Sequence, residues 1–175
     1  MRRLAPGVRA LGLLALLLAS GAGSAPVLAA PDDVALLKSY IGTWRGRGTL
    51  TGANVETVVC RLTLAEGNRD MVNYNGRCTL AGTQLSIAGT VAYVEANKRY
   101  EAAMSSNAKF GGRAIGQKRG GNVIFTMHER DKDEAGKDLD ISAQMKFSQD
   151  AIHVVFDVVY VDNGDSLRAE VPFSR

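Results

Sequence analysis

Hydrophobic and polar residues alternate with a period of two along most of the chain. The clearest stretch, residues 139–148, alternates Leu, Ile, Ala, Met and Phe with Asp, Ser, Gln, Lys and Ser. Successive side chains of a β-strand point to opposite faces, so this pattern predicts a strand with one buried face. Ahead of the alternating stretches, residues 32–40 predict a short helix. Asp32 or Asp33 can cap this helix, and Gly42 ends it.

About ten alternating stretches are separated by turn sequences that suit hairpins. No long helix lies between them, so parallel strands joined by crossover helices are excluded. We therefore predict an all-β domain, an antiparallel meander closed or nearly closed into a barrel, because closure removes both sheet edges. A sandwich or a half-open barrel is the alternative. The predicted strands are 44–50, the two that flank 66–70, and then 83–94, 99–105, 112–118, 122–129, 139–148, 151–161 and 166–174.

The two cysteines lie on either side of the turn-rich stretch EGNRD, residues 66–70. If the chain folds back about residue 69, Cys60 lies opposite Cys78, and Leu64 lies opposite Tyr74. All four side chains then point to one face. We predict a cross-strand disulfide, which suits an exported chain. A redox-active pair is the alternative, but the spacing is not C-x-x-C.

The first 29 residues have the pattern of a signal peptide. Three arginines precede the apolar run ALGLLALLLAS, which is too short to span a bilayer, and small residues lead to a cleavage site after Ala29. We predict a signal peptide over 1–29 and a single mature domain over 30–175, periplasmic or secreted. No second long apolar run follows, so we expect the mature chain not to span a membrane.

The charge balance depends on this cleavage. The chain has 21 basic and 18 acidic residues, and removal of Arg2, Arg3 and Arg9 leaves 18 of each. A near-neutral mature chain speaks against a nucleic-acid or anionic-membrane partner.

The motif GTWRGRG, residues 42–48, follows the predicted helix and opens the meander. It resembles the first strand of calycin-type barrels, which include lipocalins, fatty-acid-binding proteins and nitrobindin-like haem barrels. In lipocalins the tryptophan of G-x-W plugs one barrel end beside an arginine late in the chain. Gly42 and Trp44 match that motif. The resemblance implies a lipocalin-like barrel with Arg175 as the partner of Trp44, or Arg168 as the alternative.

Cofactor and metal sites find little support in the sequence. Nitrobindin-like barrels hold haem with a histidine on a late strand, and neither His128 nor His153 matches that position. The stretch DKDEAGKDLD superficially resembles a calcium loop, but Ala135 and Ser142 stand where two of the ligands should be. We expect a hairpin loop there, and no metal or cofactor. No serine lies in a nucleophile elbow and the acids lie mostly in turns, so we do not expect an enzyme.

Our first functional hypothesis is an exported barrel that binds a small apolar or amphipathic molecule, with tyrosine hydroxyls as its few polar contacts. The same side chains would equally serve as a packed core without a ligand. The candidate lining residues are Trp44, Leu62, Tyr74, Tyr93, Tyr100, Phe125, Met127, Met145 and Phe156.

The alternative hypothesis is a periplasmic protein–protein interaction or inhibitor module without a small-molecule ligand. Residues 151–161 are apolar on both faces. An exposed strip of Val155, Val159 and Val161 would then contact a second copy or an envelope protein.

Overall fold

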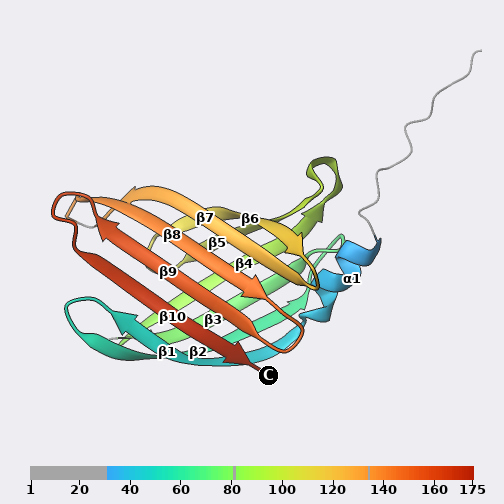
Figure 1. The fold of residues 1–175 in the computed structure, drawn as a ribbon, viewed down its shortest axis with the longest axis horizontal. Helices are drawn as coiled ribbons and strands as arrows, with labels where there is room; N and C mark the ends of the chain where they lie inside the picture. Colours follow the sequence, from blue (N-terminus) through green and yellow to red (C-terminus); the bar gives the residue numbers. More distant parts are fainter. Residues whose placement is uncertain (1–30, 81, 134) are drawn as a thin grey trace, which may run out of the picture.

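A computed structural model describes residues 31–80, 82–133 and 135–175. The chain forms a ten-stranded antiparallel barrel with a short helix at one end (Figure 1). The predicted signal peptide, residues 1–29, lies outside the described residues. The elements are α1 (Pro31–Ser39), β1 (Gly42–Thr51), β2 (Val55–Glu66), β3 (Val72–Leu80), β4 (Thr83–Val94), η1 (Glu95–Asn97), β5 (Arg99–Ser106), β6 (Gly111–Arg119), β7 (Asn122–Lys132), β8 (Asp138–Phe147), β9 (Ile152–Tyr160) and β10 (Ser166–Ser174).

Each strand pairs with its neighbours in sequence, and β1 pairs with β10 to close the barrel. The predicted meander and its closure are confirmed, and the sandwich and the half-open barrel are not formed. The closing seam depends on Gly48. A Cβ atom at this position would lie 1.9 Å from the carbonyl oxygen of Glu170, so only glycine lets the two backbones approach.

The register between β2 and β3 is the one that the cysteines predict. Cys60 lies opposite Cys78 and Leu64 lies opposite Tyr74. The two cysteines form a disulfide, which confirms the predicted staple. Cys60 is buried inside the barrel, so the bridge faces the core and not the solvent.

The two ends of the barrel differ. At the end where β1 begins, α1 covers the opening, and this end is called the helix end below (Figure 1). Gly42 joins α1 to β1 with a φ of +148°, a conformation that favours glycine. The opposite end, where β1 ends at Thr51 and β10 begins at Ser166, is called the mouth. Neither described helix is long and apolar enough to cross a bilayer.

Candidate ligand-binding site

Trp44 fills the helix end of the barrel. Its side chain is fully buried, and the indole Nε1 donates a hydrogen bond to the carbonyl oxygen of Tyr40 at 3.0 Å. The guanidinium carbon of Arg175 lies 4.5 Å from the centroid of the indole ring, and the same group donates to the carbonyl oxygen of Ser39 at 2.6 Å. This is a cation–π contact that also ties the last strand to the helix.

The structure thus brings Trp44 and Arg175 together with Gly42, which begins the same strand as Trp44. Arg168, the alternative partner for Trp44, lies on the outer face of the barrel. It binds both carboxylate oxygens of Asp157 at 2.8 and 2.9 Å.

Ion pairs hold α1 over the helix end. Asp33 accepts hydrogen bonds from the Tyr100 hydroxyl at 2.9 Å and from the Lys118 ammonium at 3.0 Å. Lys38, on the other side of the helix, pairs with Asp70 at 2.8 Å. Burial opposes ionisation of Asp33, but the hydrogen bonds from Lys118 and Tyr100 outweigh it and lower the pKa of this carboxyl. The helix end is therefore shut, and Tyr93 and Tyr100, whose rings are 5.1 Å apart, pack beneath the lid.

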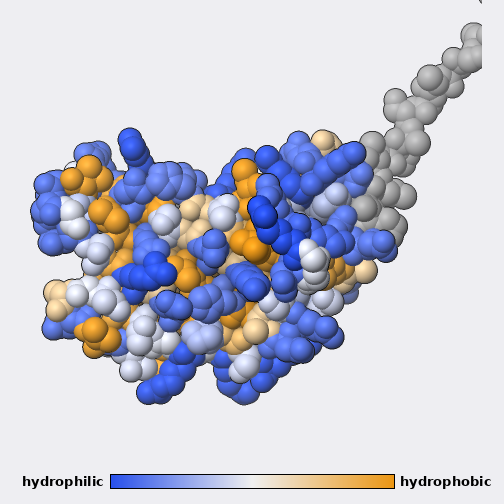
Figure 2. Space-filling model, in the orientation of Figure 1, coloured by the Kyte–Doolittle hydropathy of each residue, from blue (hydrophilic) through white to orange (hydrophobic). Residues whose placement is uncertain are grey.

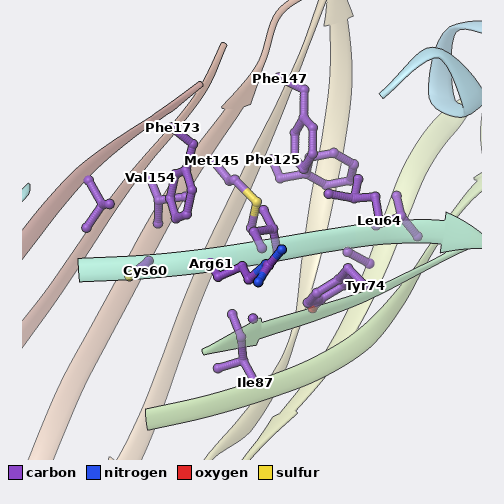
Figure 3. Close-up of a pocket in the computed structure, with 15 residues that line it drawn as sticks. Cys60, Arg61, Leu64, Tyr74, Ile87, Phe125, Met145, Phe147, Val154 and Phe173 are labelled. Atoms are coloured by element: carbon purple, nitrogen blue, oxygen red, sulfur yellow. The ribbon is translucent and has the colours of Figure 1, made fainter. Parts of the chain in front are cut away.

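The middle of the barrel is nearly filled. The cavity there has a volume of about 90 Å³ and a mostly apolar lining that includes Leu62, Tyr74, Phe125 and Met145 (Figure 3). A smaller void of about 30 Å³ reaches Met127. Cavities of about 150 Å³ accept benzene, and ordinary ligand pockets measure about 300–1,000 Å³. These four side chains therefore form a packed core around a space too small for more than a few atoms.

Glycine explains how Tyr74 spans this core. The Tyr74 hydroxyl donates to the carbonyl oxygen of Ala103 at 3.2 Å. A Cβ atom on Gly89 would lie 2.5 Å from that hydroxyl, so the phenol crosses the strand where no side chain stands. Burial raises the pKa of Tyr74 to about 12.

Alkaline solution is therefore expected to weaken the barrel. Between pH 10 and pH 12 the unfolded chain loses the Tyr74 proton while the folded chain keeps it, so the unfolded state is stabilised. The free energy of unfolding should fall by about 1.4 kcal/mol per pH unit for one such group. Burial and the hydrogen bond to Asp33 also raise the pKa of Tyr100, which adds to the fall.

Urea denaturation at pH 9 to 12 checks this expectation. Tyr74→Phe should show a shallower fall than the wild type, and the same change at Tyr160 serves as the control. Equal slopes for the wild type and Tyr74→Phe would contradict the assignment.

The mouth holds a large pocket. Its volume is about 790 Å³, and the rings of Phe110 and Phe156 pack together in its wall with centroids 5.5 Å apart. The space-filling view shows apolar surface on both sides of a notch at this end (Figure 2). The apolar side chains that line the pocket are Leu80, Leu85, Phe110, Leu139, Ile141, Phe156 and Val158.

Polar groups surround this apolar wall. Asn107, Lys109, Asp131, Lys132 and Asp133 also line the pocket. The rim beyond is partly apolar, because four exposed hydrophobic residues occupy strand ends or turns at this end of the barrel. They are Val55, Val159, Val161 and Leu167. A pocket whose lining combines an apolar wall with these polar groups suits an amphipathic molecule.

The acidic stretch at the mouth is a hairpin loop. The Asp133 carboxylate accepts hydrogen bonds from the backbone N–H groups of Ala135 and Lys137, each at 2.9 Å. Within the described ranges, no group of three or more histidine, cysteine, aspartate or glutamate side chains has the arrangement of a metal site. Asp133 therefore shapes the turn between β7 and β8.

Both histidines lie on the outer face of the barrel. His128 pairs with Asp140 at 3.4 Å, with 64% of its side chain exposed, and His153 pairs with Glu170 at 3.1 Å. Neither faces the interior, so neither offers an axial ligand to a haem inside the barrel.

The valines of β9 do not form the predicted strip as one continuous surface. Val155 is half-buried, Val159 is exposed, and Val161 lies in the following turn. Asp157 shares their face between Val155 and Val159 and binds Arg168. Val159 and Val161 are thus exposed as predicted, Val155 is only half-exposed, and the pair of Asp157 and Arg168 interrupts the strip. A contact of these valines with a second copy or an envelope protein stays a prediction.

Of the predicted lining residues, only Phe156 lies at the mouth. The others lie in the packed core or under the helix. The sequence pattern did not single out most of the mouth wall, although Leu85, Leu139 and Ile141 have inward parity. The position of a residue along its strand could have predicted the mouth wall. Gly42 marks the helix end, so inward residues at the other end of each strand lie at the mouth.

Two solved structures show what this barrel is similar to. Rv2717c from M. tuberculosis matches with a TM-score of 0.63 and 14% sequence identity, over 84% of this chain and 99% of that chain. A de novo designed fluorescence-activating β-barrel matches with a TM-score of 0.42 and 14% identity, over 79% of this chain and 95% of that one. No family model matches the chain, and no curated protein matches its sequence. At this identity the similarity to Rv2717c shows a shared barrel fold alone.

Proposed function

We propose that this protein is an exported, lipocalin-like barrel that binds a small amphipathic molecule at its mouth. The observation that carries the proposal is the apolar pocket of about 790 Å³ at the mouth. Its size lies within the usual range of about 300–1,000 Å³ for ligand pockets. The ligand's apolar part would lie against Phe110 and Phe156, and its polar part would remain at the edge.

The rest of the barrel supports this location. The helix end is shut by α1 and Trp44, and the central cavity is too small for a ligand of ordinary size. The mouth is the end where a molecule can enter without opening the fold. The internal disulfide suits the oxidising compartment that export implies.

A binding experiment tests the mouth. The mature chain is titrated with N-phenyl-1-naphthylamine, an uncharged dye that fluoresces in apolar surroundings. Phe156→Glu places a charge on the pocket wall and is expected to weaken dye binding at least tenfold, since the lost apolar contact contributes about 1.5–3 kcal/mol.

Val55→Glu is the matched control. Val55 is 71% exposed and lies at the same end, outside the pocket lining. It should leave dye affinity unchanged. Unchanged binding in Phe156→Glu would contradict the proposal. Native mass spectrometry that shows a dimer or a bound protein, lost in Val55→Glu, would favour the interaction module instead.

A further inference from the structure

Three arginines form a row across the outer face of the barrel. Arg45 of β1 lies directly opposite Arg61 of β2, and Arg61 lies directly opposite Arg77 of β3. These strands lie side by side in the barrel wall (Figure 1). Directly opposite residues have Cβ atoms about 4.5–5.5 Å apart, so the three guanidinium groups share one small area. Arg47 is two residues along β1 from Arg45, on the same face, and adds a fourth. We call these four residues the arginine row.

The side chains of the arginine row have no acidic partner among the described residues. None of the four guanidinium groups forms a hydrogen bond or an ion pair with a described residue. Other cations of the barrel wall do form them, as Arg168 does with Asp157 and Lys132 with Asp138. The outward side chains directly across from the row, or two residues along its strands, are uncharged. They are Thr43, Thr49, Val59, Thr63, Asn75, Thr79, Ser86, Pro172 and Ser174. Glu170, the outward residue opposite Thr49, pairs with His153 at 3.1 Å.

Like charges directly opposite each other destabilise a sheet, so the row works against the fold. Two features hold it in place. The Cys60–Cys78 disulfide bridges the pair immediately next to Arg61 and Arg77, and the β1–β2 ladder sets Arg45 against Arg61. The barrel therefore presents a concentrated positive charge that its own residues leave uncompensated.

We propose that the arginine row binds a small soluble molecule that carries two or more linked phosphate groups. A shallow groove of about 730 Å³ runs over the row and is lined by all four arginines together with Thr79 and Ser174. Guanidinium groups bind phosphate oxygens through paired hydrogen bonds, and several guanidiniums in a row need more than one anionic group to satisfy them. A diphosphate supplies closely spaced negative charges of that kind.

The surroundings disfavour a nucleic acid. Single-stranded nucleic acids are bound through aromatic side chains on which the bases stack, and the groove has no aromatic side chain on its outer face. Its lining includes only one aromatic residue, Phe173, whose side chain is buried in the core. The near-neutral total charge of the mature chain does not oppose this site, because the positive charge is locally concentrated on β1, β2 and β3.

Calorimetric titration of the mature chain with inorganic pyrophosphate at low ionic strength tests the proposal. Wild type should bind, with an affinity that falls as salt is added. Arg61→Gln removes the centre of the row and should weaken binding about tenfold or more, since a hydrogen bond between charged groups contributes that much. Arg130→Gln, which removes the same charge from β7 opposite Asp140, should bind as wild type does.

A second readout separates binding from folding. Arg61→Gln relieves like-charge repulsion, so its melting temperature without ligand should equal or exceed that of wild type, whereas a structural arginine would lower it on removal. The proposal is overturned if pyrophosphate does not bind, or if both variants weaken binding equally. Binding to phosphatidylglycerol vesicles without binding to pyrophosphate would also overturn it, because the row would then be a membrane-facing patch.

Discussion

Replacing Trp44 by alanine is expected to lower the free energy of unfolding by about 3–5 kcal/mol, the usual range for a fully buried tryptophan. The indole is buried to 0% exposure and joins three parts of the chain. It lies within β1, donates to Tyr40 after α1, and supports Arg175 at the end of β10. Its loss leaves a void at the centre of the helix end and removes the contact that anchors the last strand.

Urea denaturation followed by far-ultraviolet circular dichroism measures this change, because the variant has no tryptophan to report by fluorescence. Trp44→Phe keeps an aromatic ring but lacks the indole N–H, so its loss should be smaller than that of Trp44→Ala. A loss below about 1 kcal/mol in Trp44→Ala, well under the usual range for such a truncation, would show that the helix end does not depend on the plug.

Removing the disulfide by the double change Cys60→Ala and Cys78→Ala is expected to lower the free energy of unfolding by about 3 kcal/mol. The chain-entropy model gives this value for a loop of the observed size, with a sequence separation of 18 residues. Alanine is used instead of serine because Cys60 is buried and a serine there would place a hydroxyl group in the core. The strands should still form, because the β2–β3 ladder supplies its own hydrogen bonds.

The measurement compares urea midpoints with and without a thiol reductant. The wild type should lose most of the difference when reduced, and the double variant should not respond to the reductant. An unchanged midpoint in the double variant would show that the disulfide does not stabilise the folded chain.

The strands and their order could be predicted from the sequence because apolar and polar residues alternate along a half-buried strand. The same cysteine register implies that Arg61 lies opposite Arg77, as the structure shows, although the sequence analysis did not single out this pair. Arg45 could not be added to that row from the sequence. Its position depends on the turn between β1 and β2, which carries no such covalent marker.

The location of the pocket within the barrel could not be predicted from the sequence, for another reason. Glycines on the inward face suggest free space, but side chains from the neighbouring strand occupy it. A Cβ atom on Gly116 would lie 2.5 Å from the ring of Phe125, and one on Gly112 would lie 2.6 Å from the sulfur of Met127. Free volume is a small difference between large packed volumes, so parity alone cannot show which part of a barrel is filled.

The meander has a consequence for how the chain reaches its native state. Nine of the ten strand pairings join consecutive strands and close short loops, whereas the β1–β10 pairing joins the two ends of the domain. Loop-closure entropy and contact order make that last pairing the slowest step to form. Until β10 is in place, β1 and β9 are unprotected edges on which another chain can add a strand. Folding yield at high protein concentration should therefore depend on the seam, and residues such as Gly48 influence aggregation even where they contribute little to binding.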